Sequence, residues 1–469
     1  MTSQPPQPQK VNAQVQIANS VIGPLSLAMS TSFQPAEWDY QFFTINPAAT
    51  TTLGNLLPQH VRLQGISQGV PQTSATTWDF SILDAITQPV LGVGDHSPEF
   101  QIAGAPAFMY DSQHNFLDPT YQQFAAYTQN LVRYYNTGGF TAPDGSHVSP
   151  SPYPVACWGI YNEPNFNNLD STQYTQLYNA IVPAMQSVDP SLKFAAVELG
   201  DYSGLAQTYL PAFVSGVTAH VDVLATHFYS TCNQSDSDET IFSTVSGFVS
   251  EVQSIRAQLQ ANPNLALVPV WVTENNVNAD FDKGGGISAC NGTPFVTDLR
   301  GSSAFFAAWR PYVFSQFAKA GVQALYHWDF DADAQFGELD YNTGGLQLSY
   351  WVDYWLARMF PSQPGANILQ AANSDAGEIE VLAAQNPDGS VVTMVANHAL
   401  NAPADNNGPG APRTVSIDLS ALGSFHSASL LTIDSGTSVT SGPTATSVTP
   451  APQMTVSLTG YGVAFLTLK

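Results

Sequence analysis

Basic residues are scarce in this chain of 469 residues, which has 12 lysines and arginines against 36 acidic residues and a net charge of −24. Because no basic run is present that could neutralise a phosphate backbone, we expect no nucleic-acid partner. No apolar run approaches the roughly 20 residues needed to span a bilayer, so we expect no membrane partner either. Apolar residues still make up 44% of the chain. That is enough for a large core, and the composition predicts a soluble globular protein.

Cysteine is also rare, with three residues in the chain. Cys157 lies inside an apolar run, and we expect it to be a buried, small apolar residue. Cys232 and Cys290 each follow a predicted strand end, in loops that would be neighbours if the two strands are adjacent. Two alternatives stay open for them, a disulfide and two free thiols. Because no histidine or second cysteine stands at ligand spacing beside either one, we expect no metal site and no cofactor.

The chain is too long for one ordinary compact domain, and its pattern changes near residue 362. Over residues 23–362, short apolar runs alternate with longer amphipathic segments, which predicts a (β/α)8 TIM barrel of the α/β class. The eight runs are Leu25–Met29, Val61–Ile66, Pro106–Tyr110, Trp158–Tyr161, Phe194–Leu199, Val223–Tyr229, Val268–Thr273 and Ala324–Trp328. The segments with helical spacing include Tyr121–Tyr135, Ser171–Val188, Thr240–Gln260 and Gly301–Ala320.

The two ends of the chain have a different pattern from the barrel region. Residues 363–469 contain short stretches of alternating apolar and polar residues between Gly, Pro, Asn and Ser, which predict a C-terminal antiparallel β-sandwich. Residues 11–22 alternate in the same way and predict a strand that joins this sandwich. Residues 1–10 are rich in Pro and Gln, and we expect a disordered tail.

Two glutamates directly follow predicted barrel strands. Glu163 stands in Asn162-Glu163-Pro164-Asn165 after the fourth run, and Glu274 follows the seventh. Catalytic groups of this fold collect at the C-terminal ends of the strands. A retaining glycosidase needs two carboxyl groups about 5 to 5.5 Å apart, one protonated to release the leaving sugar and one ionised to attack the anomeric carbon. Glu163 is our candidate acid/base and Glu274 our candidate nucleophile. The alternative for the first motif is a loop that opens a helix.

Three polar residues at the same strand ends are candidates for supporting roles. Asn162 offers an amide that can bond a sugar hydroxyl next to the reacting carbon. Tyr229 is a hydrogen-bond donor that would keep the pKa of the nucleophile low. His227 precedes it by two residues, on the same face of the predicted strand. The alternative for His227 and Tyr229 is that they are satisfied core residues.

Four motifs, taken in order, resemble the family 39 glycoside hydrolases of clan A. They are Trp158–Asn165, Tyr174–Lys193, Val221–Tyr229 and Val270–Glu274, and the resemblance covers residues 155–360. It implies a retaining mechanism in which Glu163 is the acid/base, Glu274 is the nucleophile, and Asn162, His227 and Tyr229 support them.

The resemblance also assigns two residues on other strands. Trp328 would be the aromatic platform on the eighth strand. Arg62, on the second strand, matches a position that clan members use beside the nucleophile. The alternative for Arg62 is a structural arginine paired with a neighbouring carboxylate.

The sequence departs from the family directly after the nucleophile, where Asn275-Asn276-Val277-Asn278 replaces an aromatic or Trp-Asn continuation. The leading hypothesis is a retaining enzyme that cleaves β-glycosidic bonds of plant or microbial oligosaccharides or glycosides. The alternatives are a related clan A enzyme of the β-glucuronidase type and a non-catalytic carbohydrate-binding barrel.

A further alternative is a metal-assisted hydrolase built on the acidic loop that follows the eighth strand. Asp329, Asp331, Asp333 and Glu338 have a spacing that could hold calcium through oxygen ligands, but they lack the full calcium-hand pattern. We favour a loop that contacts substrate or is simply solvated. The chain also has no histidine ligand set beside it, which weakens the metal hypothesis.

The first residues, Met1 to Pro6, lack the basic and then apolar pattern of a signal peptide, which is therefore absent or already removed. We expect removal, because scarce lysine with many Thr, Ser, Asn and Gln residues resembles exported bacterial enzymes. The expected location is secreted or periplasmic. The sequence indicates neither an oligomeric state nor a choice between exo and endo action.

Overall fold

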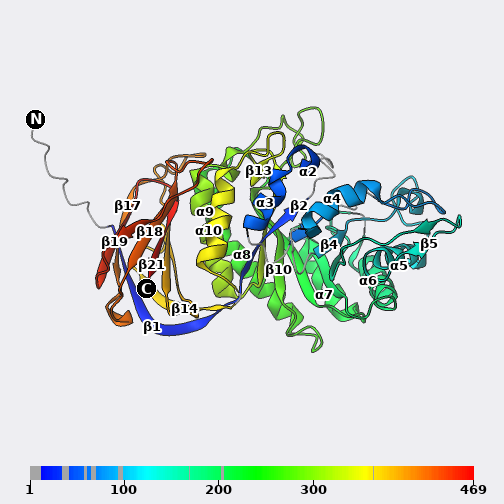
Figure 1. Ribbon diagram of the computed structural model, residues 1–469, viewed down its shortest axis with the longest axis horizontal. Helices are drawn as coiled ribbons and strands as arrows, with labels where there is room; N and C mark the ends of the chain where they lie inside the picture. The colour runs from blue at the N-terminus through cyan, green and yellow to red at the C-terminus, as the bar shows by residue number, and fades with distance from the viewer. Residues whose placement is uncertain are drawn as a thin grey trace, which may run out of the picture.

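The computed structural model describes residues 12–33, 42–56, 61–64, 70–92, 99–167, 169–201, 205–362 and 364–469. The tail predicted over residues 1–10 lies outside these ranges. A closed barrel and a nine-stranded sheet lie side by side along the long axis of the molecule (Figure 1). The predicted fold class, a TIM barrel with a β-sandwich domain, is confirmed.

The barrel consists of eight parallel strands that follow one another in chain order. They are buried almost throughout, as is usual for parallel strands covered by helices. The strands are β2 (Ala28–Phe33), β3 (Val61–Leu63), β4 (Glu99–Ile102), β7 (Cys157–Ile160), β8 (Lys193–Leu199), β9 (Val223–Thr231), β10 (Val270–Asn278) and β11 (Ala324–His327).

Helices of the described chain surround the barrel, and each of the four predicted helical segments coincides with one of them. Helix α6 illustrates why they begin where they do, because Asp170 and Gln173 form a reciprocal capping box at its start. The helices are α2 (Phe42–Ile45), α3 (Ala48–Asn55), α4 (Ser81–Gly92), α5 (Gln122–Asn136), α6 (Ser171–Gln186), α7 (Leu205–Gly216), α8 (Asp238–Leu259), α9 (Ala304–Ala320) and α10 (Leu348–Met359).

The third barrel strand differs from the prediction. The run Pro106–Tyr110 contains a 3-10 turn at Ala107–Met109, and the strand is instead β4, which pairs with β3 and β7. Glu99 and Gln101 interrupt the apolar character of β4, yet both side chains are fully buried. The search for apolar runs therefore missed a strand whose polar side chains are buried, one of which, Gln101, donates to Asn162.

The second domain is a nine-stranded sheet that folds over an apolar core, and the N-terminal strand lies near one end of it. β1 (Ala13–Leu25) runs antiparallel to β14 and parallel to β17 (Figure 1). Its buried Ala13, Val15 and Ile17 share a core with residues of the C-terminal strands. Those strands are β14 (Ala366–Asn373), β15 (Ile379–Gln385), β16 (Val391–Asn397), β17 (Arg413–Asp418), β18 (Ala428–Asp434), β19 (Thr446–Val448), β20 (Gln453–Leu458) and β21 (Gly462–Leu468).

Strands β15, β16 and β21 are buried on both faces, which joins the two domains. Val381 and Val395 face the core of the sandwich, whereas Leu382, Met394 and Phe465 belong to the same apolar cluster as the barrel. Helix α9 packs against these three strands. The sandwich is therefore attached to the barrel by a continuous apolar contact.

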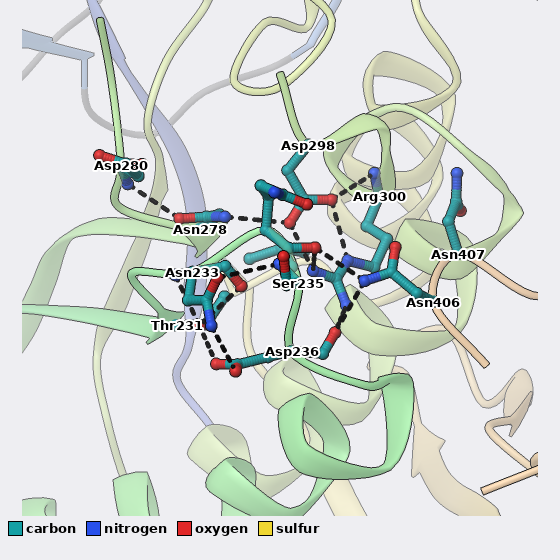
Figure 2. Close-up of polar contacts among 12 residues, drawn as sticks. Thr231, Asn233, Ser235, Asp236, Asn278, Asp280, Asp298, Arg300, Asn406 and Asn407 are labelled. Carbon is teal, nitrogen blue, oxygen red and sulfur yellow. Dashed lines mark hydrogen bonds and ion pairs between the residues drawn. The ribbon is translucent and has the colours of Figure 1, made fainter. Parts of the chain in front are cut away.

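Polar contacts tie a loop of the sandwich to loops at the C-terminal ends of β9 and β10. Figure 2 shows Asn406 approaching the segment around Asp236, and its Nδ2 lies 3.0 Å from the carbonyl oxygen of Asp236. Arg300 in the same view bonds Asp298, at 2.6 Å from Nη2 to Oδ2. Asp298 also accepts from Asn278 in β10, at 3.0 Å.

Asp238, the first residue of α8, is the acceptor on which this junction converges. Its side chain is fully buried. It accepts from the backbone N–H groups of Asn407 and Gly408 at 2.8 and 2.9 Å, and from the Tyr461 hydroxyl at 3.2 Å. Arg300 Nη1 lies 3.5 Å from it. One barrel carboxylate thus satisfies three donors of the sandwich.

The structure joins Cys232 and Cys290 in a disulfide, with Cα atoms 5.9 Å apart, and leaves Cys157 as a buried free thiol. In the part of the chain that the structure describes, no helix is both long and apolar enough to cross a membrane.

Replacing Asp238 with alanine is expected to lower the free energy of unfolding by about 3–5 kcal/mol, because three donors and Arg300 lose a buried acceptor. Urea unfolding followed by tryptophan fluorescence measures the change. Glu239→Ala, at the neighbouring exposed position, is the matched control and should change it by less than about 0.5 kcal/mol. Equal effects of the two substitutions would contradict the role given to Asp238.

Candidate active site

Glu163 follows β7 in a left-handed backbone conformation, with φ of 43°. Its backbone N–H donates to the carbonyl oxygen of Glu198 at 3.0 Å, and its Oε1 lies 2.8 Å from Nδ1 of His227. A Cβ atom at Gly200 would lie 2.6 Å from Oε1 of Glu163, so only glycine leaves room for the carboxyl group there. The side chain is 26% exposed, which keeps it accessible to a ligand.

Glu274 lies within β10, because this strand continues beyond the predicted run to Asn278. A register shift against β9 occurs directly before it. Arg62 Nη1 lies 2.7 Å from Oε1, and the Tyr229 hydroxyl donates to Oε2 at 2.8 Å. Both carboxyl oxygens therefore have a donor.

Glu163 and Glu274 face each other across His227. One carboxyl oxygen of each glutamate and one ring nitrogen of His227 all lie within 4.8 Å of one another. The structure thus brings the two sequence-predicted glutamates together with two of the residues expected to support them, His227 and Tyr229.

Arg62 is completely buried and forms the centre of the polar network. Besides Glu274, its guanidinium donates to Gln64 at 2.9 Å and to Oδ1 of Asn162 at 2.9 Å. Glu198 lies 3.4 Å from Nη2. The sequence offers two hypotheses for Arg62, a residue beside the nucleophile and a structural arginine paired with a carboxylate. Both hold in the structure, because Arg62 lies beside Glu274 and also pairs with Glu198.

Asn162 and Trp328 both contact this network, Asn162 through Arg62 and Trp328 through Gln64. Gln101 donates to Oδ1 of Asn162 at 2.7 Å, so both donors to Asn162 engage its carbonyl and leave its NH2 group for a ligand. Trp328 is 9% exposed and packs edge-on against Phe336, with ring centroids 4.8 Å apart. Tyr229 packs against the same apolar cluster.

Two buried glutamates of the site, Glu99 in β4 and Glu198 in β8, were not predicted from the sequence. Glu198 accepts from the Thr273 hydroxyl at 2.6 Å and lies 3.2 Å from Nε2 of His227. A Cβ atom at Gly159 would lie 2.7 Å from Oε1 of Glu99 and 3.2 Å from Oε1 of Glu198. The signal that could have revealed them is a glycine inside an apolar strand, together with single acidic residues in neighbouring strands.

The charges of this cluster shift several pKa values. Burial alone would lower the pKa of His227, but Glu274, Glu163 and Glu198 raise it to about 9. Burial would raise the pKa of Glu198, but Arg62 and His227 hold it at about 2. Burial and the charge of Glu198 raise the pKa of Glu99 well above its ordinary value. Glu99 and Glu198 therefore share one proton and one negative charge.

The sequence predicts that the acidic loop after β11 contacts substrate or is solvated, and the structure contradicts the second alternative. Asp329, Asp331 and Glu338 are fully buried, because the segment folds back against the barrel. Glu338 accepts from the Thr31 hydroxyl at 2.7 Å. Its carboxyl also lies near His327 and Asp353, with one ligand atom of each within 4.8 Å of the others.

Two groups of side chains could geometrically hold a metal ion. One is Glu163, His227 and Glu274, and the other is the group of His327, Glu338 and Asp353. Cationic guanidinium groups already lie against both, Arg62 at 2.7 Å from Glu274 and Arg310 at 3.0 Å from Asp353. The chemistry described below uses neither group as a metal site.

The raised pKa of His227 makes stability depend on pH. The protonated ring contributes its full stabilisation below pH 6.5, its ordinary pKa, and this contribution is lost as the pH rises through about 9. The difference between the pKa of about 9 in the folded protein and the ordinary value of 6.5 corresponds to about 3 kcal/mol of folding free energy. We expect the free energy of unfolding of the wild type to fall by roughly that amount between pH 6.5 and 9.5, measured by urea titration, and the fall to disappear in His227→Asn. If the free energy of unfolding depends on pH in the same way in both proteins, His227 is not the group responsible.

No protein-family model matches the sequence, and the comparison with curated proteins finds no similar chain. Solved structures with the same fold do exist. The GH39 enzyme from Xanthomonas axonopodis pv. citri has a TM-score of 0.66 and 16% identity, over 97% of each chain.

Two further structures match over similar lengths. A monomeric beta-xylosidase from Caulobacter crescentus has a TM-score of 0.68 and 16% identity, with 97% of this chain and 99% of that chain covered. An alpha-L-arabinofuranosidase from Thermotoga maritima has a TM-score of 0.68 and 13% identity, over 97% and 99%. At these identities the likeness shows a shared fold, and the resemblance to family 39 stated from the sequence is confirmed at that level.

Proposed function

We propose that the protein is a retaining glycoside hydrolase that cleaves β-glycosidic bonds, with Glu163 as acid/base and Glu274 as nucleophile. The observation that carries this proposal is the pair of glutamates at the C-terminal end of the barrel with carboxyl oxygens within 4.8 Å of each other. Retaining enzymes hold their two carboxyl groups about 5–5.5 Å apart, whereas inverting enzymes need about 6.5 Å or more for a water molecule.

The different surroundings of the two glutamates support the division of roles. The Glu274 side chain is 7% exposed and faces donors from Arg62 and Tyr229, which is the setting that an ionised nucleophile requires. The Glu163 side chain is 26% exposed, so it can approach a leaving group that extends toward solvent. The backbone of Glu163 is fixed by its hydrogen bond to Glu198.

In the first step, Glu274 attacks the anomeric carbon as the glycosidic C–O bond breaks, and the proton of Glu163 goes to the leaving oxygen. In the second step, water attacks the same carbon and gives a proton to Glu163, while the bond to Glu274 breaks. The NH2 group of Asn162 donates to the hydroxyl next to the reacting carbon, and Trp328 supplies an apolar face for the sugar ring.

The charges around the site favour a neutral glycone over a uronide. Of the 12 basic residues in the sequence, all but Lys10 lie in the described part of the chain. Arg62 is fully buried and occupied by Glu274, Gln64, Asn162 and Glu198. Arg300 and Arg310 are buried in pairs with Asp298 and Asp353. None of these guanidinium groups is available to pair with a sugar carboxylate.

We also propose a secreted or periplasmic location, which the disulfide between Cys232 and Cys290 supports. Disulfides persist in oxidising compartments and are rare in the cytosol.

Removing either glutamate is expected to lower turnover strongly on a substrate that the wild type hydrolyses. With aryl β-glycosides of sugars such as xylose and glucose, Glu163→Ala should lower kcat by about 10²–10⁴-fold, because general acid catalysis is lost. Glu274→Ala should be inactive, and added azide should restore turnover as a glycosyl azide of inverted configuration. Glu239→Ala is an exposed acidic control and should match the wild type. A Glu274→Ala protein with full activity would refute the mechanism, and a wild type inactive on every sugar would favour the carbohydrate-binding alternative.

A panel of aryl β-glycosides tests the neutral-glycone proposal. We expect kcat/KM for a β-glucuronide to be at least about 100-fold below that for the best neutral xyloside or glucoside, because a carboxylate at the site would meet the charge of Glu274 while Arg62, Arg300 and Arg310 are already paired. The glucoside and the glucuronide are the most informative pair of substrates, because they differ only in the group at C5. A preference for the glucuronide would overturn this choice of substrate class.

A further inference from the structure

His227 connects the two candidate catalytic glutamates with a third carboxylate that the proposed steps do not use. Its Nδ1 lies 2.8 Å from Glu163 and 3.4 Å from Glu274, and its Nε2 lies 3.2 Å from Glu198. His227 and Glu198 are both fully buried. Glu274 on the Nδ1 side and Glu198 on the Nε2 side are the ionised partners, so both ring nitrogens need a proton. Only the imidazolium form meets that requirement.

Glu198 is fixed by its side chain and by its backbone. Its carboxylate accepts from the Thr273 hydroxyl at 2.6 Å and lies 3.4 Å from Nη2 of Arg62. Val197 and Glu198 both have left-handed backbone conformations, with φ of 79° and 46°. Two successive non-glycine residues persist in this region only where the surrounding structure holds them. The strained segment also supplies the carbonyl oxygen that accepts the N–H of Glu163.

The charges inside the barrel balance only when His227 is protonated. Arg62 and His227 are then the two cations, and Glu198 and Glu274 are the two anions. Glu99 is neutral, because burial and Glu198 raise its pKa. Glu163 is also neutral before it donates its proton, and Tyr229 contributes an uncharged hydroxyl at 2.8 Å from Glu274. A neutral His227 would leave one uncompensated negative charge in a buried cluster, which is costly.

We propose that Glu198 is a positioning residue for this reaction, which holds His227 as an imidazolium between Glu163 and Glu274 and so sets the pH range of activity. The inference rests on the proposed glycosidase function. The cation at His227 stabilises the carboxylate that Glu163 becomes when its proton goes to the leaving group. It also orients Oε1 of Glu163 inward, so that the other oxygen carries the transferred proton.

The pKa values support the pairing. His227 is protonated up to about pH 9 and Glu198 is ionised down to about pH 2. Glu198 is one of three carboxyl groups that offset the burial of His227, so removing its charge lowers the pKa of His227. Both catalytic carboxyl groups would then lose part of the nearby positive charge that stabilises their ionised forms.

Glu198→Gln tests the proposal through the pH profiles of kcat and kcat/KM on the best aryl β-glycoside. We expect both limbs of the profile to move to higher pH by about one unit or more. Glu198→Asp keeps the charge and should move the limbs back toward those of the wild type. Glu380→Gln replaces another buried, hydrogen-bonded glutamate, which lies in the sandwich, and should leave the limbs unchanged. A Glu198→Gln profile that is lower but unshifted would overturn the proposal, because a merely structural role predicts that result.

A second measurement needs no substrate and separates this inference from the proposed function. In protein labelled with ¹⁵N-histidine, NMR of the ring nitrogens should show His227 protonated at pH 8 in the wild type and losing its proton at a lower pH in Glu198→Gln, with His227→Asn used for assignment. A neutral His227 in the wild type at this pH would overturn the inference even if Glu198→Gln does not fold. If the NMR result is as expected but no glycoside is hydrolysed, the function fails while the link from Glu198 to His227 stands.

Discussion

The guanidinium group of Arg62 is the interaction on which the interior of the barrel depends. It brings Glu274 and Glu198 together at 2.7 and 3.4 Å, and lies 4.0 Å from Glu99. Two buried carboxylates, Glu198 and Glu274, would repel one another strongly in a medium that screens charge poorly, and burial together with their charges keeps Glu99 protonated. A planar guanidinium with donors in fixed directions can pair with both carboxylates at once, which a lysine could not do in this geometry. The candidate catalytic geometry is therefore an outcome of charge compensation across β3, β4, β8 and β10.

Backbone space is the second constraint on this interior. Gly159 and Gly200 leave room for Glu99 and Glu163, since an added Cβ at either position would lie 2.7 Å or less from a carboxyl oxygen. The backbone is left-handed at Glu163 and at Glu198, which follow or lie in the adjacent strands β7 and β8, and the N–H of Glu163 bonds the carbonyl oxygen of Glu198. The two glycines and the left-handed residues thus make room for polar side chains in the barrel interior. In most barrels of this fold, branched apolar side chains fill that interior.

Features that depend on one local pattern, such as a strand followed by a glutamate, could be predicted from the sequence. Features that depend on contacts between several strands could not. The runs before Glu163 and Glu274 are apolar enough to identify their strands, the motifs place Asn162, His227 and Tyr229 beside them, and the family resemblance adds Arg62. β4 was assigned to the wrong segment because Glu99 and Gln101 read as surface residues in isolation. The burial of Glu338 in the acidic loop escapes local patterns for the same reason, since its hydrogen bond comes from Thr31, 307 positions earlier. A residue's partner across the barrel cannot be inferred from local composition.

Strand β1 gives the chain an unusual order of assembly. It lies between β14 and β17, and two residues after its end the chain enters β2, the first strand of the barrel. During synthesis, the barrel segments emerge from the ribosome long before the strands that β1 must pair with. Strand β1 therefore has no partner in its sheet until β14, at Ala366–Asn373, has been made. The sandwich is thus built from segments that flank the barrel in the sequence, and its strands finish pairing after the barrel strands have been made.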